Sequence, residues 1–378
     1  MRSLLQLRTP QNGNGDEHKL DGVNAALDQP TAPTSPKIRF REPQIEMAHG
    51  AGGKASRRLV EGLFAPLLFG SSADSEPLGD AVHVDFNGTR IAITTDSFVV
   101  KPLNFPGGSI GELAVNGTVN DLAVSGARAE VMVATYVLEA GLPTPVLEGE
   151  VRAMANAARK AGVRITGGDT KVVEHGKADF MYITTTGIGR PLPGLKIDAR
   201  SVRPGDKILL SGPIGDHGIT ILLARGELDL EADLRSDTRS VLPLVEALAN
   251  AAGPGVRWMR DPTRGGVATA LNELARDCGL GIVVTEETIP VRDAVRGACE
   301  LLGLDPLHIA NEGQFLAVVA PDYADAAFKA LSLAPGGEGA QMIGEVREQP
   351  SGAVLVTTRY GGSRIVDMLV GDPLPRIC

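Results

Sequence analysis

Residues 110–127 read IGELAVNGTVNDLAVSGA, an apolar segment interrupted by amides and one carboxylate. Its Leu, Ala and Val residues recur at helical spacing, which predicts a helix over residues 110–123. Asn116, Asn120 and Asp121 fall inside that helix, where a polar side chain needs a partner or a function. We therefore expect this helix to contribute to a functional site as well as to a core.

Strand-like alternation of apolar and polar residues flanks the helix, at residues 81–86 and 89–95 before it and 130–138 after it. The same pattern continues along the chain. It predicts helices at 55–68, 145–161, 218–225, 240–252 and 263–277, and strands at 163–166, 181–189, 207–211, 315–320 and 353–357. Alternating helices and strands predict an α/β (α+β) fold, and no GxGxxG motif follows the first strand to favour a dinucleotide-binding fold.

Proline-rich and polar stretches divide the chain. We expect a disordered leader at 1–43, an N-terminal domain at 44–195, a C-terminal domain at 196–360, and a C-terminal segment with a mobile tail at 361–378. Pro373 and Pro375 favour an extended tail. When extended, residues 369–378 span at most ~30 Å, enough for an inward and an outward position of the last residue.

Composition restricts the classes of function. The formal net charge is -9, which makes nucleic acid and anionic membrane poor first candidates as partners. No apolar run approaches the ~20 residues of a membrane span. The three cysteines, an odd number, argue against a disulfide framework and indicate a reducing, cytoplasmic compartment. Cys278 and Cys299 lie in apolar contexts typical of small core residues, whereas packing does not require a thiol at Cys378.

Four carboxylates stand at predicted turns, strand ends and helix positions: Asp80, Asp96, Asp121 and Asp169. Oxygen ligands of this kind suit Mg²⁺, which also binds substrate phosphates. The alternative is that each is a helix cap or turn residue.

A glycine-rich loop, HGAGGK at 49–54, contains Gly50, Gly52, Gly53 and Lys54. Glycines allow backbone amides to turn toward an anion, and a lysine adds positive charge. The spacing is not that of a Walker A loop, and an ordinary loop is the alternative.

Three further motifs combine glycines with polar side chains. In residues 165–171, a predicted strand ends at two glycines and is followed by a carboxylate, a hydroxyl and an amine, so Gly168, Asp169, Thr170 and Lys171 are candidates. DPTRGG at 261–266 predicts a helix start capped by Asp261, with glycines that permit close approach of a ligand. In NEGQ at 311–314, Glu312 is either a buried base or a structural carboxylate.

These motifs, in this order, resemble those of one family, the [NiFe]-hydrogenase maturation factor HypE, a carbamoyl dehydratase. HypE belongs to the superfamily of aminoimidazole ribonucleotide synthetase, selenophosphate synthetase and thiamine-monophosphate kinase. The resemblance covers about residues 45–378. The superfamily motifs are TTDS at 94–97, NDLAVSGA at 120–127 and GGDT at 167–170, and the HypE motifs are MAHGAGGK at 47–54, DPTRGG at 261–266, NEGQ at 311–314 and PRIC at 375–378.

The resemblance implies a two-domain fold like that of aminoimidazole ribonucleotide synthetase. Its N-terminal sheet domain forms a homodimer, its C-terminal domain is α+β, and ATP and Mg²⁺ bind in the cleft. A carbamoyltransferase, HypF, places a carbamoyl group on the terminal cysteine, here Cys378. The carbamoyl group is then dehydrated to a thiocyanate, and the cyanide passes to iron on a HypC–HypD scaffold.

The resemblance also suggests roles for the candidate residues. Cys378 carries the substrate, Glu312 is the candidate base, and Lys171 polarises or orients the carbamoyl group. Asp80, Asp96, Asp121 and Asp169 would hold the metal. The remaining candidates would contact ATP: Gly50, Gly52, Gly53, Lys54, Asn116, Asn120, Gly168, Thr170 and Asp261. One departure concerns Asp80, which stands alone where many relatives carry two aspartates.

Other functions were weighed against this one. A selenophosphate synthetase would carry a cysteine or selenocysteine in or near the loop at 49–54, which has none. A thiamine-phosphate kinase or a cyclo-ligase has no use for a terminal thiol. A non-catalytic scaffold that passes a group through Cys378 stays open, and it would show no ATP hydrolysis dependent on a carbamoyl donor.

Overall fold

The computed structural model describes residues 39–69, 78–226, 232–371, 374 and 376–378. Most of the predicted leader, residues 1–38, lies outside the described residues. Its last part is described: the Phe40 N–H donates to the Gly62 carbonyl, and the Phe40 ring meets the His49 ring edge-on at 5.3 Å. This end of the predicted leader therefore packs against the glycine-rich loop.

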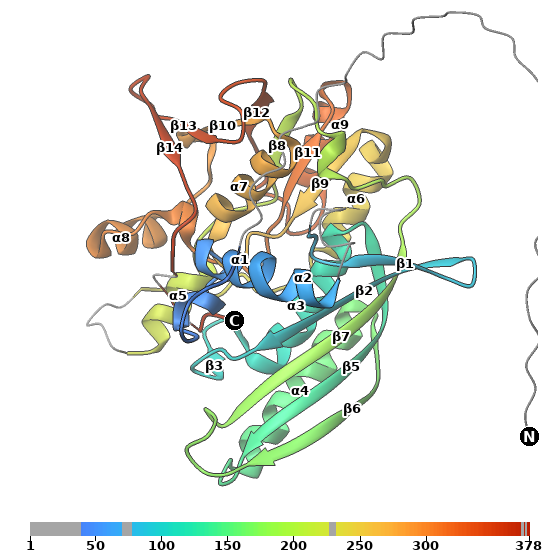
Figure 1. The fold of residues 1–378 in the computed structure, drawn as a ribbon, viewed down its shortest axis with the longest axis vertical. Helices are drawn as coiled ribbons and strands as arrows, with labels where there is room; N and C mark the ends of the chain where they lie inside the picture. Colours follow the sequence, from blue (N-terminus) through green and yellow to red (C-terminus); the bar gives the residue numbers. More distant parts are fainter. Residues whose placement is uncertain (1–38, 70–77, 227–231, 372–373, 375) are drawn as a thin grey trace, which may run out of the picture. The chain divides into compact units, whose positions relative to one another are not determined.

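The first sheet has five strands among the described residues, in the order β1-β2-β7-β5-β6 (Figure 1). Strands β5 and β6 pair in parallel, and the other neighbours pair antiparallel. The strand bounds are β1 Val82–Phe86, β2 Thr89–Phe98, β5 Ala127–Glu139, β6 Arg164–Val173 and β7 Met181–Pro191. This order leaves β6 at one edge of the sheet, separated from β2 by the two strands β7 and β5.

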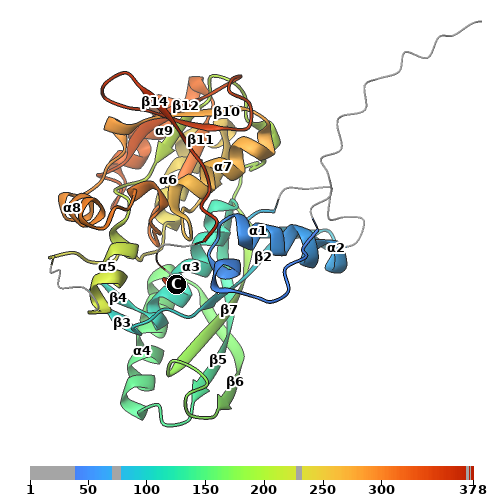
Figure 2. The ribbon, with the colours of Figure 1, turned by 60° about the vertical axis from the view of Figure 1, so that its left-hand side comes forward.

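Helices α3 (Ile110–Val124) and α4 (Thr144–Ala161) cover one face of this sheet (Figure 2). Helix α3 confirms the predicted helix and is almost entirely buried, which explains its apolar sequence. Gly187 of β7 permits its close approach, because a Cβ there would lie 2.7 Å from the Thr118 side chain. Helix α4 is amphipathic and ends at Gly162, whose φ of 71° favours glycine.

The second sheet has seven strands among the described residues, in the order β14-β13-β10-β12-β8-β11-β9. Along each strand, successive side chains face opposite sides, so both faces need a cover. Leu209 and Ala317 pack in the core that includes α6 and α9, whereas Ile208 and Leu316 pack with α7. The sheet is therefore enclosed by helices on both faces, as expected for an α/β layer structure.

The bounds of the elements around the second sheet complete the fold (Figure 1). The strands are β8 Lys207–Leu210, β9 Val256–Arg260, β10 Gly281–Thr285, β11 Leu316–Val319, β12 Gln341–Arg347, β13 Val354–Thr357 and β14 Ser363–Val366. The helices are α5 Asp216–Ala224, α6 Leu242–Ala252, α7 Gly266–Cys278, α8 Asp293–Leu302 and α9 Pro321–Leu333. Two short strands, β3 Asn104–Phe105 and β4 Gly108–Ser109, form a hairpin before α3.

The helix predicted over residues 55–68 is confirmed, with an internal change of geometry. It consists of α1 (Lys54–Leu59), a π-helical turn at Val60–Phe64 and α2 (Ala65–Leu68). The preceding 3₁₀ turn at Met47–Gly50 forms the first part of the glycine-rich loop.

Two of the sequence predictions about local structure are wrong. The strand predicted at 163–166 does not stop before the GGDT motif, because β6 continues through the motif to Val173. The helix predicted at residues 263–277 begins only at Gly266, so Asp261 does not cap it. The N-cap is Gly265, with a φ of 75°.

The cysteine predictions agree with the structure: Cys299 is buried and Cys278 is half-buried. In the part of the chain that the structure describes, every helix is too short or too polar to cross a bilayer.

Candidate functional site

Three carboxylates from distant parts of the sequence converge. Asp80 lies in the turn before β1, Asp121 is on α3, and Asp261 follows β9. Each offers an oxygen, and these oxygens all lie within 4.8 Å of one another. Asp261 comes here because it directly follows β9, which ends at Arg260. The glycines further on serve packing, since a Cβ on Gly266 would lie 2.5 Å from the Leu307 carbonyl oxygen.

The pKa values of these carboxyl groups are perturbed. Burial, and then the nearby charges of Asp261, Asp80 and Asp96, hold the pKa of Asp121 well above its usual range. Burial and the charge of Asp80 likewise raise the pKa of Asp261. Such repulsion between buried carboxylates is relieved when a cation binds among them. The donor set of carboxylate oxygens fits Mg²⁺.

A neighbouring cation already pairs with one member of the group. Arg260 donates to Asp80 at 2.5 Å and to Glu273 at 2.9 Å. Burial still raises the pKa of Asp80, although Arg260 opposes that effect. Asp80, the predicted ligand that departs from the family pattern, thus belongs to the acidic group, together with Asp261, which was predicted to contact nucleotide.

Asp96 lies on the edge of this group. It is on β2, which runs on to Phe98 and does not end at Asp96 as predicted. Its carboxylate accepts the Ser97 N–H at 2.8 Å, and its charge raises the pKa values of Asp80, Asp121 and Asp261.

The fourth predicted ligand, Asp169, is elsewhere. It is exposed on β6 and accepts the Lys171 ammonium at 2.6 Å, which holds the pKa of the Asp169 carboxyl below its usual range. Gly168 allows β6 to pair closely with β5, because a Cβ there would lie 1.7 Å from the Ala134 carbonyl oxygen. Within one chain, this strand presents Gly168, Asp169, Thr170 and Lys171 together at the sheet edge, apart from Asp80, Asp121 and Asp261.

The glycines of the loop at 49–54 are largely explained by packing. A Cβ on Gly52 would lie 2.6 Å from the Arg264 Cβ, and one on Gly53 would lie 2.3 Å from the Leu369 carbonyl oxygen. The Lys54 ammonium pairs with Asp367 at 2.5 Å. The loop therefore connects the DPTRGG turn with the segment that leads into the tail. The role of Gly50, Gly52, Gly53 and Lys54 in binding ATP stays a prediction.

The two predicted asparagines join the halves of the molecule. The Asn116 amide donates to the Thr238 hydroxyl at 3.2 Å. The Asn120 amide donates to the carbonyls of Arg239 and Glu312, and its carbonyl oxygen accepts the Val241 N–H. These bonds satisfy polar groups that are buried in α3. Their contact with nucleotide stays a prediction.

Glu312 is buried, with 3% of its surface exposed, and its Oε1 has no hydrogen-bond partner among the described residues. Burial and the charges of Asp261 and Asp96 raise the pKa of this carboxyl well above its usual range. A carboxyl group in such a state is a stronger base than an exposed one, as acid–base catalysis near neutral pH requires.

Arg264 connects these groups with the end of the chain. The charge of Cys378 is the largest influence on the Arg264 guanidinium and raises its pKa. Burial opposes this shift, and the charges of Asp96 and Glu312 raise the pKa further. Cys378 is itself buried, with 9% exposed. Arg264 was not among the predicted site residues. Its place between Thr263 and the two glycines, as the cation of a motif that also supplies Asp261, is the signal that could have identified it.

Both ribbon views place the C-terminus between α3 and α5 (Figures 1 and 2). The Val99 N–H, at the end of β2, donates to the Cys378 carbonyl at 3.0 Å. The described part of the tail therefore occupies the inward position. The outward position stays a prediction.

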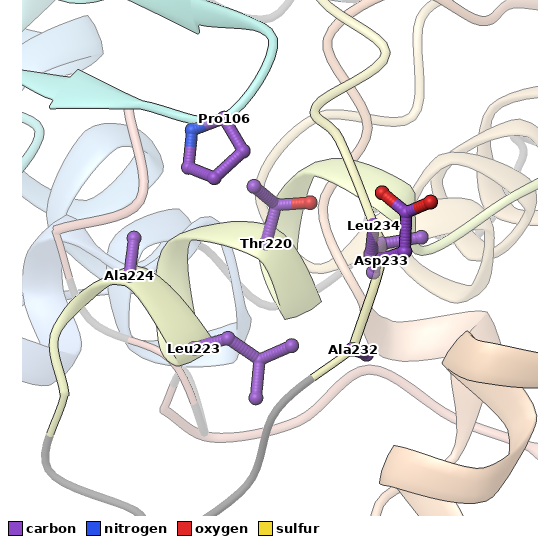
Figure 3. Close-up of a pocket in the computed structure, with 7 residues that line it drawn as sticks. All are labelled: Pro106, Thr220, Leu223, Ala224, Ala232, Asp233 and Leu234. Carbon is purple, nitrogen blue, oxygen red and sulfur yellow. The ribbon is translucent and has the colours of Figure 1, made fainter.

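A separate cavity of about 520 Å³ lies beside α5 (Figure 3). Thr220, Leu223 and Ala224 of α5 form one wall, and residues 232–234 face them. None of the lining residues is a predicted site residue, so the acidic group and the cavity are distinct places in the fold.

Comparisons with known proteins agree with this fold. A family model described as "AIR synthase related protein, N-terminal domain" matches residues 78–190, and one described as "AIR synthase related protein, C-terminal domain" matches residues 203–357. The carbamoyl dehydratase HypE of Azotobacter vinelandii is 48% identical over 90% of this chain and 99% of its own length. The protein of the same name from Escherichia coli (strain K12) is 42% identical over 88% and 99%.

Solved structures give the same result. HypE in a HypE–HypF complex superposes with a TM-score of 0.77 at 43% identity, covering 82% of this chain and 99% of that chain. HypE in complex with ATP gives a TM-score of 0.73 at 44% identity, covering 88% and 99%. A thiamine-monophosphate kinase from Aquifex aeolicus, at 19% identity and a TM-score of 0.57, shows a shared fold only.

Proposed function

The chain belongs to the HypE family of carbamoyl dehydratases, which act in hydrogenase maturation, and on that premise we propose that it dehydrates a carbamoyl group carried on Cys378. ATP drives the reaction, and the product is a thiocyanate that supplies the cyanide ligand of the hydrogenase iron. One observation carries the proposal: Cys378 is buried beside Arg264, whose guanidinium also faces Asp96 and Glu312.

The reaction must remove one oxygen and two protons from the carbamoyl group. The carbamoyl oxygen takes the terminal phosphoryl group of ATP and leaves as phosphate, while the nitrogen loses both protons, so S–C(=O)–NH₂ and ATP give S–C≡N, ADP and phosphate. Glu312 is suited to accept a proton because its raised pKa makes its carboxylate a stronger base. Arg264 offsets negative charge at Cys378.

The acidic group fits a metal site for this reaction. Asp80, Asp121 and Asp261 would hold Mg²⁺, with Asp96 nearby. The ion, when bound, supplies positive charge that stabilises the phosphoryl group during transfer. Without it, the chain's own carboxylates repel one another and repel phosphate, so the pKa shifts described above support the same assignment.

A homodimer would explain the residues at the sheet edge. The face of the first sheet opposite α3 exposes apolar side chains, including Val133 and Ile188, and β6 is an edge strand. A second copy placed on this face would bury these side chains and the edge. In that arrangement, Asp169 and Lys171 of one chain serve the site of the other, where Lys171 orients the carbamoyl group.

The partners follow from the chemistry at Cys378. HypF is the carbamoyl donor, as a solved complex of a similar HypE with HypF supports. A HypC–HypD scaffold carrying iron is the acceptor of cyanide. To reach both partners, Cys378 must leave its buried position, and the reducing cytoplasm would keep its thiol available.

The test is intact-mass spectrometry of the full chain incubated with HypF, carbamoyl phosphate and ATP. The expected result is a gain of one carbamoyl group followed by loss of one water, with both steps absent in Cys378→Ala. Carbamoylation without loss of water, in the presence of Mg²⁺ and ATP, would contradict a dehydratase and favour a carrier scaffold. Cys278→Ala serves as the matched control, because it removes a different thiol.

A further inference from the structure

The last three residues of the chain are held by separate groups of the body of the protein. We propose that Val99, Asp179 and His217 form a receptor for the tripeptide Arg376-Ile377-Cys378 and so position Cys378 in the site. This proposal rests on the proposed function in one respect, namely that Cys378 carries the substrate. The three receptor residues come from the end of β2, the turn before β7 and α5.

His217 recognises the backbone of the tail. It is completely buried, and its Nε2 lies 3.0 Å from the Ile377 carbonyl oxygen. Its Nδ1 lies 2.7 Å from the Ser236 hydroxyl, which itself accepts the Thr238 N–H. Because a carbonyl oxygen can only accept, Nε2 carries the ring hydrogen and donates it to the tail. In the neutral ring, Nδ1 then accepts the hydrogen of the Ser236 hydroxyl.

The surroundings keep this histidine in one state. Burial lowers the pKa of His217 to about 4, although the bond to Ile377 opposes this shift. The Phe105 ring packs edge-on against the imidazole at 5.6 Å between centroids. A neutral ring with a fixed tautomer offers one donor in one direction, which suits the recognition of a single carbonyl group.

Asp179 recognises the side chain of Arg376. The two groups form an ion pair, and the Arg376 guanidinium also lies 5.9 Å from the centroid of the Tyr182 ring. Lys101 and Arg376 together hold the pKa of the Asp179 carboxyl below its usual range, so it is ionised and available to the tail. The Arg376 carbonyl accepts the Arg225 guanidinium at 2.9 Å.

Val99 contacts both ends of the tripeptide through its backbone. Its N–H donates to the Cys378 carbonyl at 3.0 Å, and its carbonyl accepts the Arg376 guanidinium at 3.1 Å. Between these two contacts the side chain of Ile377 is buried, with 2% exposed. The receptor thus contacts a cationic side chain, the backbone carbonyl of a buried apolar residue and the last residue in sequence, as a binding site for a peptide would.

The docked position has a consequence for reactivity. Cys378 and Cys299 are both buried, at 9% and 1% exposed, but only Cys378 depends on the receptor. Loss of one good hydrogen bond or ion pair from the receptor lowers the equilibrium constant for docking of the tail by about tenfold. The exposed fraction of tails, and with it the rate of alkylation at Cys378, should rise by the same factor.

The experiment measures alkylation of each cysteine by iodoacetamide in the full chain, by peptide mapping, without ATP or carbamoyl donor. Asp179→Asn and His217→Leu should raise the rate at Cys378 about tenfold while Cys299 stays protected. His217→Gln keeps an N–H donor and should restore part of the protection. Asp198→Asn is the matched control, because Asp198 also pairs with an arginine, Arg200, outside the tail.

Unchanged alkylation at Cys378 in Asp179→Asn, with Cys299 protected, would overturn the receptor. Equal rates for His217→Leu and His217→Gln would overturn the role of His217. If His217→Leu also exposes Cys299, its effect is global, and the decision rests on a double-mutant cycle of Asp179→Asn with Arg376→Gln. A double variant no more reactive than either single variant supports the pair, and additive effects contradict it. Because no nucleotide is present, failure of dehydration would leave these outcomes unaffected.

Discussion

The guanidinium of Arg264 lies beside Cys378, and the negative charge of Cys378 is the largest influence on its raised pKa. The same guanidinium lowers the pKa values of Asp96 and Glu312. One cation therefore acts on the substrate carrier, a carboxylate near the metal ligands and the candidate base.

Arg264→Ala should slow dehydration of the carbamoylated chain by about 10²-fold or more, because an electrostatic contact in a buried site is lost. Carbamoylation by HypF should be little affected, since we propose that this step occurs with the tail outward. Intact-mass time courses separate the two steps. Arg200→Ala, which removes an exposed arginine paired with Asp198, is the control. A normal rate of water loss in Arg264→Ala would remove this residue from the reaction.

Glu312→Gln should abolish dehydration and change the pH dependence of stability. The pKa of Glu312 is raised in the folded chain, so its contribution to the free energy of unfolding is complete below its unfolded pKa. That contribution is lost as pH rises through the folded pKa. Between about pH 5 and pH 8, the native chain should lose more stability than Glu312→Gln.

Urea unfolding without Mg²⁺ or ATP measures this difference. Glu338→Gln is the matched control, because Glu338 is exposed and its pKa is lowered. Parallel pH profiles for the native chain and Glu312→Gln would show that Glu312 is ionised in the folded protein, contrary to its burial.

Asp121→Asn should remove the response of the chain to Mg²⁺. Binding of the ion with ATP at 100 times its dissociation constant stabilises a folded chain by about 2.7 kcal/mol, which raises the melting temperature. The variant should lose most of this rise. Without the ion it should be as stable as the native chain or more so, because one of the repelling carboxylates is gone. Asp322→Asn, an exposed change on α9, should keep the full response.

Mixing two inactive variants tests the homodimer. If Lys171 acts in the partner's site, a heterodimer of a Lys171→Ala chain and a Cys378→Ala chain contains one complete site. Dehydration should therefore reappear after the two variants are mixed and allowed to exchange. If Lys171 acts in its own chain, both sites stay incomplete and no activity returns. Val133→Glu, on the exposed face of the sheet, should prevent the recovery by weakening the dimer.

Much of the fold could be predicted because helical and strand periodicities are strong where one side of an element is buried. The helix at 110–123 is confirmed almost to the residue. The predicted strand ends at the GGDT motif because glycines are unfavourable inside strands, whereas in the structure Gly168 serves the close pairing of β6 with β5. Several elements were not predicted at all: strands β3, β4, β9, β10, β12 and β14 and helices α8 and α9.

The candidate site was only partly predictable. Glycine and carboxylate motifs identified Asp80, Asp121 and Asp261, but their meeting depends on contacts between segments 41 to 181 residues apart, which no local pattern contains. For the same reason, the sequence could not separate Asp169 from this group. The helix asparagines were noticed as unusual, although their hydrogen bonds to residues 238–241 and Glu312 could not be foreseen.

Strand β2 carries Asp96 toward the acidic group, and Val99, the residue directly after the strand, contacts the tail three positions later. In an extended strand these positions are about 10 Å apart, and the sheet keeps that spacing nearly constant. The distance between the acidic group, where phosphate would bind, and the docked Cys378 is thus set by a stiff backbone segment. It does not depend on the position that the tail takes when it is undocked. Insertion or deletion of one residue between Asp96 and Val99 would also turn one of the two residues to the other side of the sheet relative to its neighbour. This short interval should therefore tolerate substitutions far better than changes in length.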